Sequence, residues 1–252
     1  MQEREVARRI ADELLSVGVR PGGVLLVHSS LSAMGHVIGG AETVIQGLLE
    51  AMGSEGTLLM PALSYEIVTP ERSTFDVRRT PSNTGAIPEY FRTRSGTRRS
   101  VHPTHSACGV GPLTEALLGE HILDITPCGS HSPFRRLRDV GGQILMLGCG
   151  LKPNTSMHGI EELAEPPYLF GPPLVYRLVL SDGRIQRKAY RQHNFIGWVQ
   201  RYDRVGALLS QDGLKTGYVL DAKAYLLEAS ALWEAALTAL RQDPLYFVDR
   251  AA

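Results

Sequence analysis

The chain has 252 residues, of which 43% are hydrophobic and 21% are charged, and its 26 basic residues balance 26 acidic ones. A neutral chain argues against a nucleic-acid binder that neutralises phosphates, and this length buries a core without disulfides or a structural metal. No apolar run approaches the length of a signal-peptide core or a membrane span. We therefore expect a soluble, cytoplasmic protein with no nucleic-acid or membrane partner.

The first sixty residues predict helices and strands in alternation. A first helix ends before Pro21–Gly22, and its apolar residues recur at helical spacing at Val6, Ile10, Leu14 and Val17. Residues 24–27 and 57–60 predict two buried strands, and the segment after Gly39–Gly40 predicts a helix between them. This order predicts a parallel sheet with helical crossovers.

Residues 64–100 lack any periodic pattern and are rich in Thr, Pro, Arg and Glu. Only residues 87–92 predict a short helix there. A long irregular segment inside a compact α/β chain is usually functional, so we expect a lid or a substrate-binding loop.

The remaining residues predict a strand at 144–147, a hairpin around Ser181–Asp182–Gly183 and a final helix. We expect Asp221 to cap that helix, which ends before Asp243–Pro244. Its predicted inner face comprises Leu226, Ser230, Trp233, Leu237 and Leu240. Without an internal repeat or a clear linker, residues 1–252 predict one α/β domain, with a central mostly parallel or mixed sheet flanked by helices.

Several common motifs are missing from the sequence. It has no P-loop, no Gly-x-Ser-x-Gly elbow and no His-Glu-x-x-His pair, and Pro153 replaces the third glycine of a dinucleotide fingerprint after Gly148–Cys149–Gly150. Its three cysteines form no Cys-x-x-Cys pair, which disfavours a zinc ribbon. We therefore expect no metal, and a metal-dependent hydrolase has little support.

Polar loops follow several predicted strands, where open α/β sheets bind ligands. They include His28–Ser29–Ser30–Leu31, His102–Pro103–Thr104–His105–Ser106 and Ser130–His131–Ser132–Pro133–Phe134, the last with an aromatic residue that we expect to be exposed. Each loop alone is typical of a plain turn. The isolated histidines are interpreted as structural or solvent-facing, namely His28, His36, His121 and His131.

The segment after Gly150 holds a possible acid–base pair. If the chain is helical after Asn154, His158 and Glu161 lie on one face, one turn apart. A histidine held by a carboxylate at a strand-to-helix junction suits a general base. The alternative is an ordinary surface pair.

Taken together, these motifs resemble the aminoglycoside 3-N-acetyltransferase family, also called the antibiotic N-acetyltransferases. They occur in the family's order from about residue 3 to about residue 248, almost the whole chain. The matching pieces are Val27-His28-Ser29-Ser30-Leu31, Gly39-Gly40-Ala41-Glu42-Thr43, Glu55-Gly56-Thr57-Leu58-Leu59-Met60-Pro61, His102-Pro103-Thr104-His105-Ser106, Ser132-Pro133-Phe134, Gly148-Cys149-Gly150, Asn154-Thr155-Ser156-Met157-His158-Gly159-Ile160-Glu161 and Asp243-Pro244.

The resemblance implies a fold particular to this family and distinct from that of GNAT enzymes. It implies acetyl transfer from acetyl-CoA to an amino group, the 3-amino group of a 2-deoxystreptamine aminoglycoside, and hence antibiotic resistance. His158 matches the family's catalytic histidine and Glu161 the acidic residue one turn further on. The loops expected to meet the coenzyme supply Ser29, Ser30, Leu31, Thr104, Ser106, Ser132 and Phe134.

Acetyl transfer to an amine needs a base, because an ammonium group cannot attack a thioester. A neutral imidazole suits this task near pH 7, and a carboxylate partner orients the ring. Direct transfer needs no enzyme nucleophile. The developing oxyanion needs a donor, for which backbone N–H groups or the Thr155 hydroxyl are candidates.

A polycationic acceptor predicts an acidic site in this neutral protein. The residues that we assign to substrate binding are Tyr65, Glu66, Asp76, Glu89 and Glu162. The alternative for each carboxylate is a solvated surface charge.

One stretch departs from the family pattern. Members associated with aminoglycosides carry a further acidic residue after the hairpin, whereas residues 189–195 here contain no carboxylate and include the cationic Arg191. Either Glu161 alone orients His158, or Gln192, His193 or Asn194 takes over the contact. The acceptor substrate is therefore either an aminoglycoside or another small amine. The competing hypothesis is a catalytically weak homologue that serves as a small-molecule binding protein. The sequence leaves monomer and homodimer open.

Overall fold

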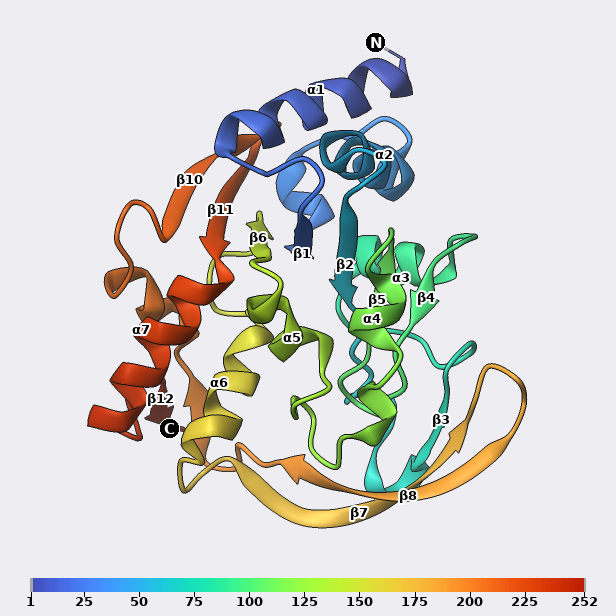
Figure 1. Cartoon of the computed structure of the whole chain (residues 1–252), viewed down its shortest axis with the longest axis vertical. Helices are drawn as coiled ribbons and strands as arrows, with labels where there is room; N and C mark the ends of the chain where they lie inside the picture. Colours follow the sequence, from blue (N-terminus) through green and yellow to red (C-terminus); the bar gives the residue numbers. More distant parts are fainter. Residues whose placement is uncertain (1, 252) are drawn as a thin grey trace.

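A seven-stranded mixed sheet forms the centre of the molecule in the computed structural model, which describes residues 2–251 (Figure 1). The central strands are parallel, because β1 pairs in parallel with both β6 and β2. The outer strands are antiparallel. In spatial order the sheet comprises β10 (Leu214–Val219), β11 (Ala222–Glu228), β6 (Gln143–Leu147), β1 (Val24–Ser29), β2 (Thr57–Pro61), β5 (Ala107–Val110) and β4 (Arg98–Arg99).

Helices cover both faces of this sheet. Successive residues of a strand point to opposite faces, so Leu25 and Val27 enter one core, whereas Val24 and Leu26 enter the other. The first core is covered by α1 (Glu3–Val17), α2 (Gly40–Met52) and α3 (Ala86–Thr93). The second is covered by α4 (Thr114–Leu118), α5 (Pro133–Asp139), α6 (Ser156–Ala164) and α7 (Ala229–Gln242). The predicted α/β fold, a mixed sheet flanked by helices, is confirmed.

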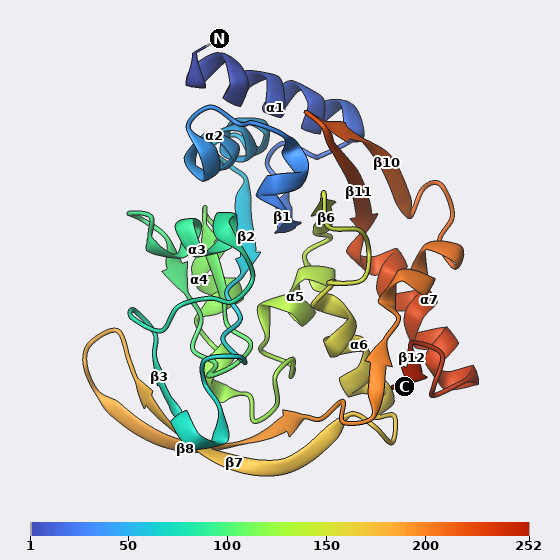
Figure 2. The ribbon, with the colours of Figure 1, turned by 180° about the vertical axis from the view of Figure 1, so that it is seen from behind.

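A second, three-stranded sheet contains the predicted hairpin. Its strands are β3 (Thr74–Asp76), β7 (Phe170–Val179) and β8 (Ile185–His193). The β7–β8 hairpin runs as a long curved arm along the foot of the molecule, in both views (Figures 1 and 2). β8 ends at His193, and the side chain of this residue bonds to Glu162 of α6.

The smaller elements complete the chain. β9 (Trp198–Gln200) pairs with β12 (Val248–Arg250). Short 3-10 helices occur at Leu31–Met34, Pro70–Arg72, His121–Leu123 and Tyr202–Ala207. Residues 64–100 are irregular except for short elements, including α3 at the predicted position. Within residues 2–251, no helix is long and apolar enough to cross a membrane.

The predicted start of the last helix is wrong. Asp221 does not cap a helix; it lies in the turn between β10 and β11, beside Leu220 with a φ of 51°. Leu226 belongs to β11, whose buried residues alternate as Ala222, Ala224 and Leu226. The helix begins at Ala229. The helical spacing of Leu226 was misleading because strand and helix periods coincide over so short a run.

Candidate active site

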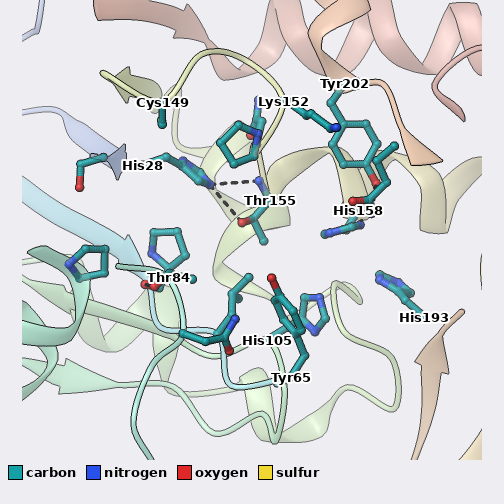
Figure 3. Close-up of a pocket in the computed structure, with 18 of the residues that line it drawn as sticks. His28, Tyr65, Thr84, His105, Cys149, Lys152, Thr155, His158, His193 and Tyr202 are labelled. Carbon is teal, nitrogen blue, oxygen red and sulfur yellow. Dashed lines mark hydrogen bonds between the residues drawn. The ribbon is translucent and has the colours of Figure 1, made fainter. Parts of the chain in front are cut away.

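A cavity of about 500 Å³ lies beyond the carboxyl ends of β1 and β2, between α6 and the end of the β8 arm. Figure 3 shows side chains converging on it from distant parts of the chain. They include His28 from β1, His158 from α6 and His193 from β8. His28 lies at the end of β1, and His105 lies in the loop before β5, which its antiparallel pairing with β2 brings to the same edge. The predicted loop at Ser130–Phe134 lines neither cavity.

His158 is held from behind by a carboxylate and a phenol. Its Nδ1 lies 3.3 Å from Oε2 of Glu161 and 3.0 Å from the Tyr202 hydroxyl. Tyr202 donates to Oε2 of Glu161 at 2.6 Å, and Tyr168 donates to Oε1 at 2.8 Å. Glu161 is fully buried, so these contacts replace the water that a carboxylate needs.

This network sets the tautomer of the neutral imidazole. Because the Tyr202 hydroxyl donates to Glu161, its oxygen and the carboxylate are acceptors toward Nδ1 of His158. We infer that Nδ1 carries the proton and that Nε2 has a free lone pair. Burial and the charge of Glu161 raise the pKa of both phenols far above the usual value, so Tyr168 and Tyr202 stay protonated donors.

Thr155, at the start of α6, is bonded to His28. Its backbone N–H donates to Nε2 of His28 at 3.0 Å, and its hydroxyl lies 3.1 Å from the same nitrogen (Figure 3). Burial lowers the pKa of His28 to about 3, so this imidazole is neutral and accepts. The Ser156 N–H donates to the Asn154 side chain. The backbone donors of Thr155 and Ser156 are therefore occupied, and the Thr155 hydroxyl is the candidate that remains for an oxyanion.

A second cavity, of about 550 Å³, adjoins the first at Ser29. The predicted coenzyme residues Ser29, Ser30 and Leu31 line it. Gly40 and Ala86, the first residues of α2 and α3, also line it, so the backbone N–H groups of two helix N-termini are close by. Such ends favour phosphate groups.

Comparison with known proteins identifies the family. The model described as aminoglycoside 3-N-acetyltransferase matches residues 26–241. Aminoglycoside N(3)-acetyltransferase IV of Salmonella sp is 34% identical over 239 residues, which cover 94% of this chain and 87% of that protein. The chain belongs to the aminoglycoside 3-N-acetyltransferase family. The predicted resemblance and the predicted class of acyltransferase are thereby confirmed.

Solved structures of this family share the fold. A mutant of aminoglycoside acetyltransferase AAC(3)-IVa in complex with a gentamicin has a TM-score of 0.81 and 32% identity, covering 94% of this chain and 89% of that one. AAC-IIIb, solved as a binary complex with CoASH, has a TM-score of 0.81 and 27% identity, covering 92% and 95% of the two chains.

Four of the residues expected to line the coenzyme line neither of the two cavities. Ser106, Ser132 and Phe134 are fully buried, and Ser106 is bonded to Arg99 and to the Ala62 carbonyl. The expectation that Phe134 is exposed is wrong, because it packs in the core beneath α5. Thr104 does not line either cavity but lies 2.9 Å from Nδ1 of His105, whose ring does. The coenzyme role of these residues stays a prediction, and the burial of Ser106, Ser132 and Phe134 disfavours it.

The predicted acidic substrate site is not assembled. Tyr65 lines the first cavity, but the carboxylates assigned with it do not. Glu66 is exposed, and Asp76 accepts backbone N–H groups of its own turn. Glu89 pairs with Arg92. Glu162 is buried behind His193, where it also accepts from the Cys128 N–H at 2.7 Å. Their positions in the sequence did not reveal the groups to which these carboxylates bond.

The structure also decides which residue orients His158. Glu161 and Tyr202 contact its Nδ1, and neither Gln192 nor Asn194 bonds to it. His193 lies beside it, with ring centroids 4.9 Å apart and the ring planes tilted by 45°, but bonds to Glu162 instead. The family pattern gave no signal for Tyr202, which lies 44 residues away in a 3-10 helix.

Proposed function

We propose that this protein is an acetyl-CoA-dependent N-acetyltransferase that acetylates an amino group of an aminoglycoside, the 3-amino group of its 2-deoxystreptamine ring. One observation carries the proposal. His158 lines the cavity, its Nδ1 is held by Glu161 and Tyr202, and its second nitrogen is left to act as a base. Membership in the family supports the same reaction.

The reaction follows from these contacts as a direct transfer. The amine nitrogen attacks the thioester carbonyl carbon while His158 takes a proton from it, and Glu161 stabilises the imidazolium. The Thr155 hydroxyl turns from His28 to donate to the oxyanion. The carbon–sulfur bond then breaks, and the proton on His158 passes to the departing thiolate. No enzyme nucleophile takes part.

The coenzyme is assigned to the second cavity. Ser29, Ser30 and Leu31 contact the pantetheine arm, and the helix N-termini at Gly40 and Ala86 face the phosphates. The two cavities meet at Ser29, so the thioester and the amine arrive from different sides. The structure of a family member with CoASH supports use of this coenzyme.

The charges of the residues that line the first cavity support a second class of acceptor substrate. Among the described residues that line it, none is Asp or Glu, and Lys152 carries a positive charge. Arg191 does not line this cavity, and its guanidinium lies over the Phe170 ring at 3.9 Å. A polycation prefers an acidic wall. A small amine with fewer positive charges, acetylated by the same step, is therefore the second candidate substrate.

Thiol release from acetyl-CoA tests the proposal. Purified protein is assayed against a panel of aminoglycosides, including gentamicin and apramycin, and against simple mono- and diamines. We expect turnover with aminoglycosides bearing a free 3-amino group, and mass spectrometry locates the acetyl group. Turnover confined to the simple amines would favour the second candidate. Tight drug binding with no turnover on any amine would sink the enzyme assignment and leave a binding protein.

A further inference from the structure

Three histidines surround one point at the edge of the first cavity. His105, His158 and His193 each offer one ring nitrogen, and these three nitrogens lie within 4.8 Å of one another. Figure 3 shows the three rings gathered at the same end of the cavity. They come from three separated parts of the chain, so no linear motif announces the cluster.

Each ring has one nitrogen bound from behind. Nδ1 of His105 is 2.9 Å from the Thr104 hydroxyl, and Nδ1 of His158 is held by Glu161. Nε2 of His193 donates to Glu162 at 2.8 Å. Metal-binding histidines have this arrangement, because the hydrogen bond fixes the ring and leaves the opposite nitrogen as a ligand.

The third ring supplies an independent observation. The His193 side chain is only 4% exposed, yet its Nδ1 has no hydrogen-bond partner. A buried polar atom without a partner is costly and calls for an explanation. With Nε2 donating to Glu162, the orphan Nδ1 is an acceptor, and a cation would satisfy it.

We propose that His105, His158 and His193 form a binding site for a divalent transition-metal cation of the Zn²⁺ type, with the fourth coordination position open to the cavity. Neutral imidazoles suit zinc and its neighbours, whereas Mg²⁺ and Ca²⁺ prefer oxygen ligands.

The site closes slightly when the cation binds. Ligand nitrogens about 2.0–2.1 Å from a tetrahedral zinc lie roughly 3.4 Å from one another. In the structure the three nitrogens lie within 4.8 Å of one another, which is a wider spacing. Small rotations of the rings bring them to the spacing that zinc needs. His158 lies at the cavity wall with 12% of its side chain exposed.

His158 cannot bind a metal ion and act as the base at the same time. A metal ion takes the lone pair that accepts the proton from the amine, so the bound cation inhibits acetyl transfer. This consequence rests on the proposed function, whereas metal binding itself does not. The site is thus a point of inhibition by zinc rather than a catalytic centre.

Metal binding is measured first, without any coenzyme or amine. Chelator-treated protein is titrated with Zn²⁺ against a chromogenic chelator, and with Co²⁺ by visible absorption. We expect one equivalent to bind with the absorption of a four-coordinate site. His105→Ala and His193→Gln each weaken binding at least about tenfold, while His131→Ala, which removes a histidine that lines neither cavity, binds as the parent does. Absence of binding, or equal affinity in all variants that melt like the parent, would overturn the proposal.

Inhibition is measured second, on the full chain. If the protein acetylates amines, Zn²⁺ lowers turnover at the concentration at which it binds, and chelator restores it. His131→Ala is inhibited as the parent is. Zinc that binds without inhibiting would contradict the overlap with His158, as would activity that chelator abolishes and zinc restores. If the protein has no acetyltransferase activity, only the proposed function is contradicted, because the binding titration tests the metal site independently.

Discussion

His158 is the residue on which the proposed reaction depends, and its surroundings are unusually polar for a buried site. A fully buried carboxylate, Glu161, accepts from two phenols and lies within reach of the ring. Hydrogen bonds donated to both of its oxygens stabilise the charged form. The pair is thus not the ordinary surface pair that was the alternative from the sequence.

Replacing His158 tests the base. His158→Ala lowers turnover at least about a hundredfold, in the range that a positioned general base contributes, while coenzyme affinity is kept because the ring lines the other cavity. Thiol release and isothermal titration with coenzyme A measure the two effects. His131→Ala serves as the control. Near-normal turnover in His158→Ala would place the base elsewhere.

Replacing Tyr202 tests the orientation of the imidazole. Tyr202→Phe removes the hydroxyl that bridges His158 and Glu161, and we expect turnover to fall about tenfold, equivalent to about 1.4 kcal/mol of barrier. Tyr168→Phe is the matched control, since that phenol bonds to Glu161 but not to the ring. Equal losses in both variants would assign the effect to Glu161 alone.

At the scale of elements, α6 carries the site and α7 holds α6 in place. Gly159 follows His158 on α6, and its backbone packs against the Trp233 ring of α7. A Cβ atom at this position would lie 2.7 Å from the ring, closer than real contacts allow. Trp233 is 2% exposed and closely packed, so the helix rather than the ring must shift.

Gly159→Ala tests this packing. The added methyl group overpacks the contact, and we expect a loss of about 1–3 kcal/mol in the free energy of unfolding, measured by urea denaturation. Turnover falls too, because His158 moves with α6. The double variant with Trp233→Phe removes the ring atoms that clash and recovers part of the loss in a double-mutant cycle. Strictly additive losses would contradict a direct clash.

At the scale of the whole molecule, buried neutral histidines link stability to pH. Burial lowers the pKa of five of them, namely His28, His102, His105, His121 and His193. The pKa of His121 falls to about 4, against about 6.5 in an unfolded chain. Between these values the unfolded chain binds the proton and the folded one does not, so stability is lost as the pH falls below about 6.5.

The slope of that loss is measurable. Urea unfolding at pH 7.5, 6.5 and 5.5 shows constant stability above about pH 7 and a steep fall below it, with each buried histidine contributing up to about 1.4 kcal/mol per pH unit. His121→Gln keeps a hydrogen-bonding side chain beside Ser100 and Pro127 but does not titrate. The variant is less stable at pH 7.5 and its slope is shallower. Flat stability from pH 7.5 to 5.5 would refute the linkage.

Much of the framework was predictable from local pattern. The buried strands at 24–27 and 57–60, the hairpin at Asp182–Gly183 and the helix after Asn154 all follow from periodicity and turn residues. The β10–β11 strands were missed because their residues alternate over only a few positions before a true helix begins. The extent of a single domain over residues 1–252 stays a prediction.

By itself, the sequence determined the fold class, the family and the placement of His158 and Glu161 one turn apart on a helix, since these depend on residues close together or on motifs in order. Only the tertiary structure decided that Tyr202 completes the pair, that Phe134 and Ser132 are buried, and that His105 and His193 approach the same point as His158. The physical reason is that these contacts join segments far apart in the chain. Their geometry is set by how the β8 arm and the strand-end loops pack, which no local pattern encodes.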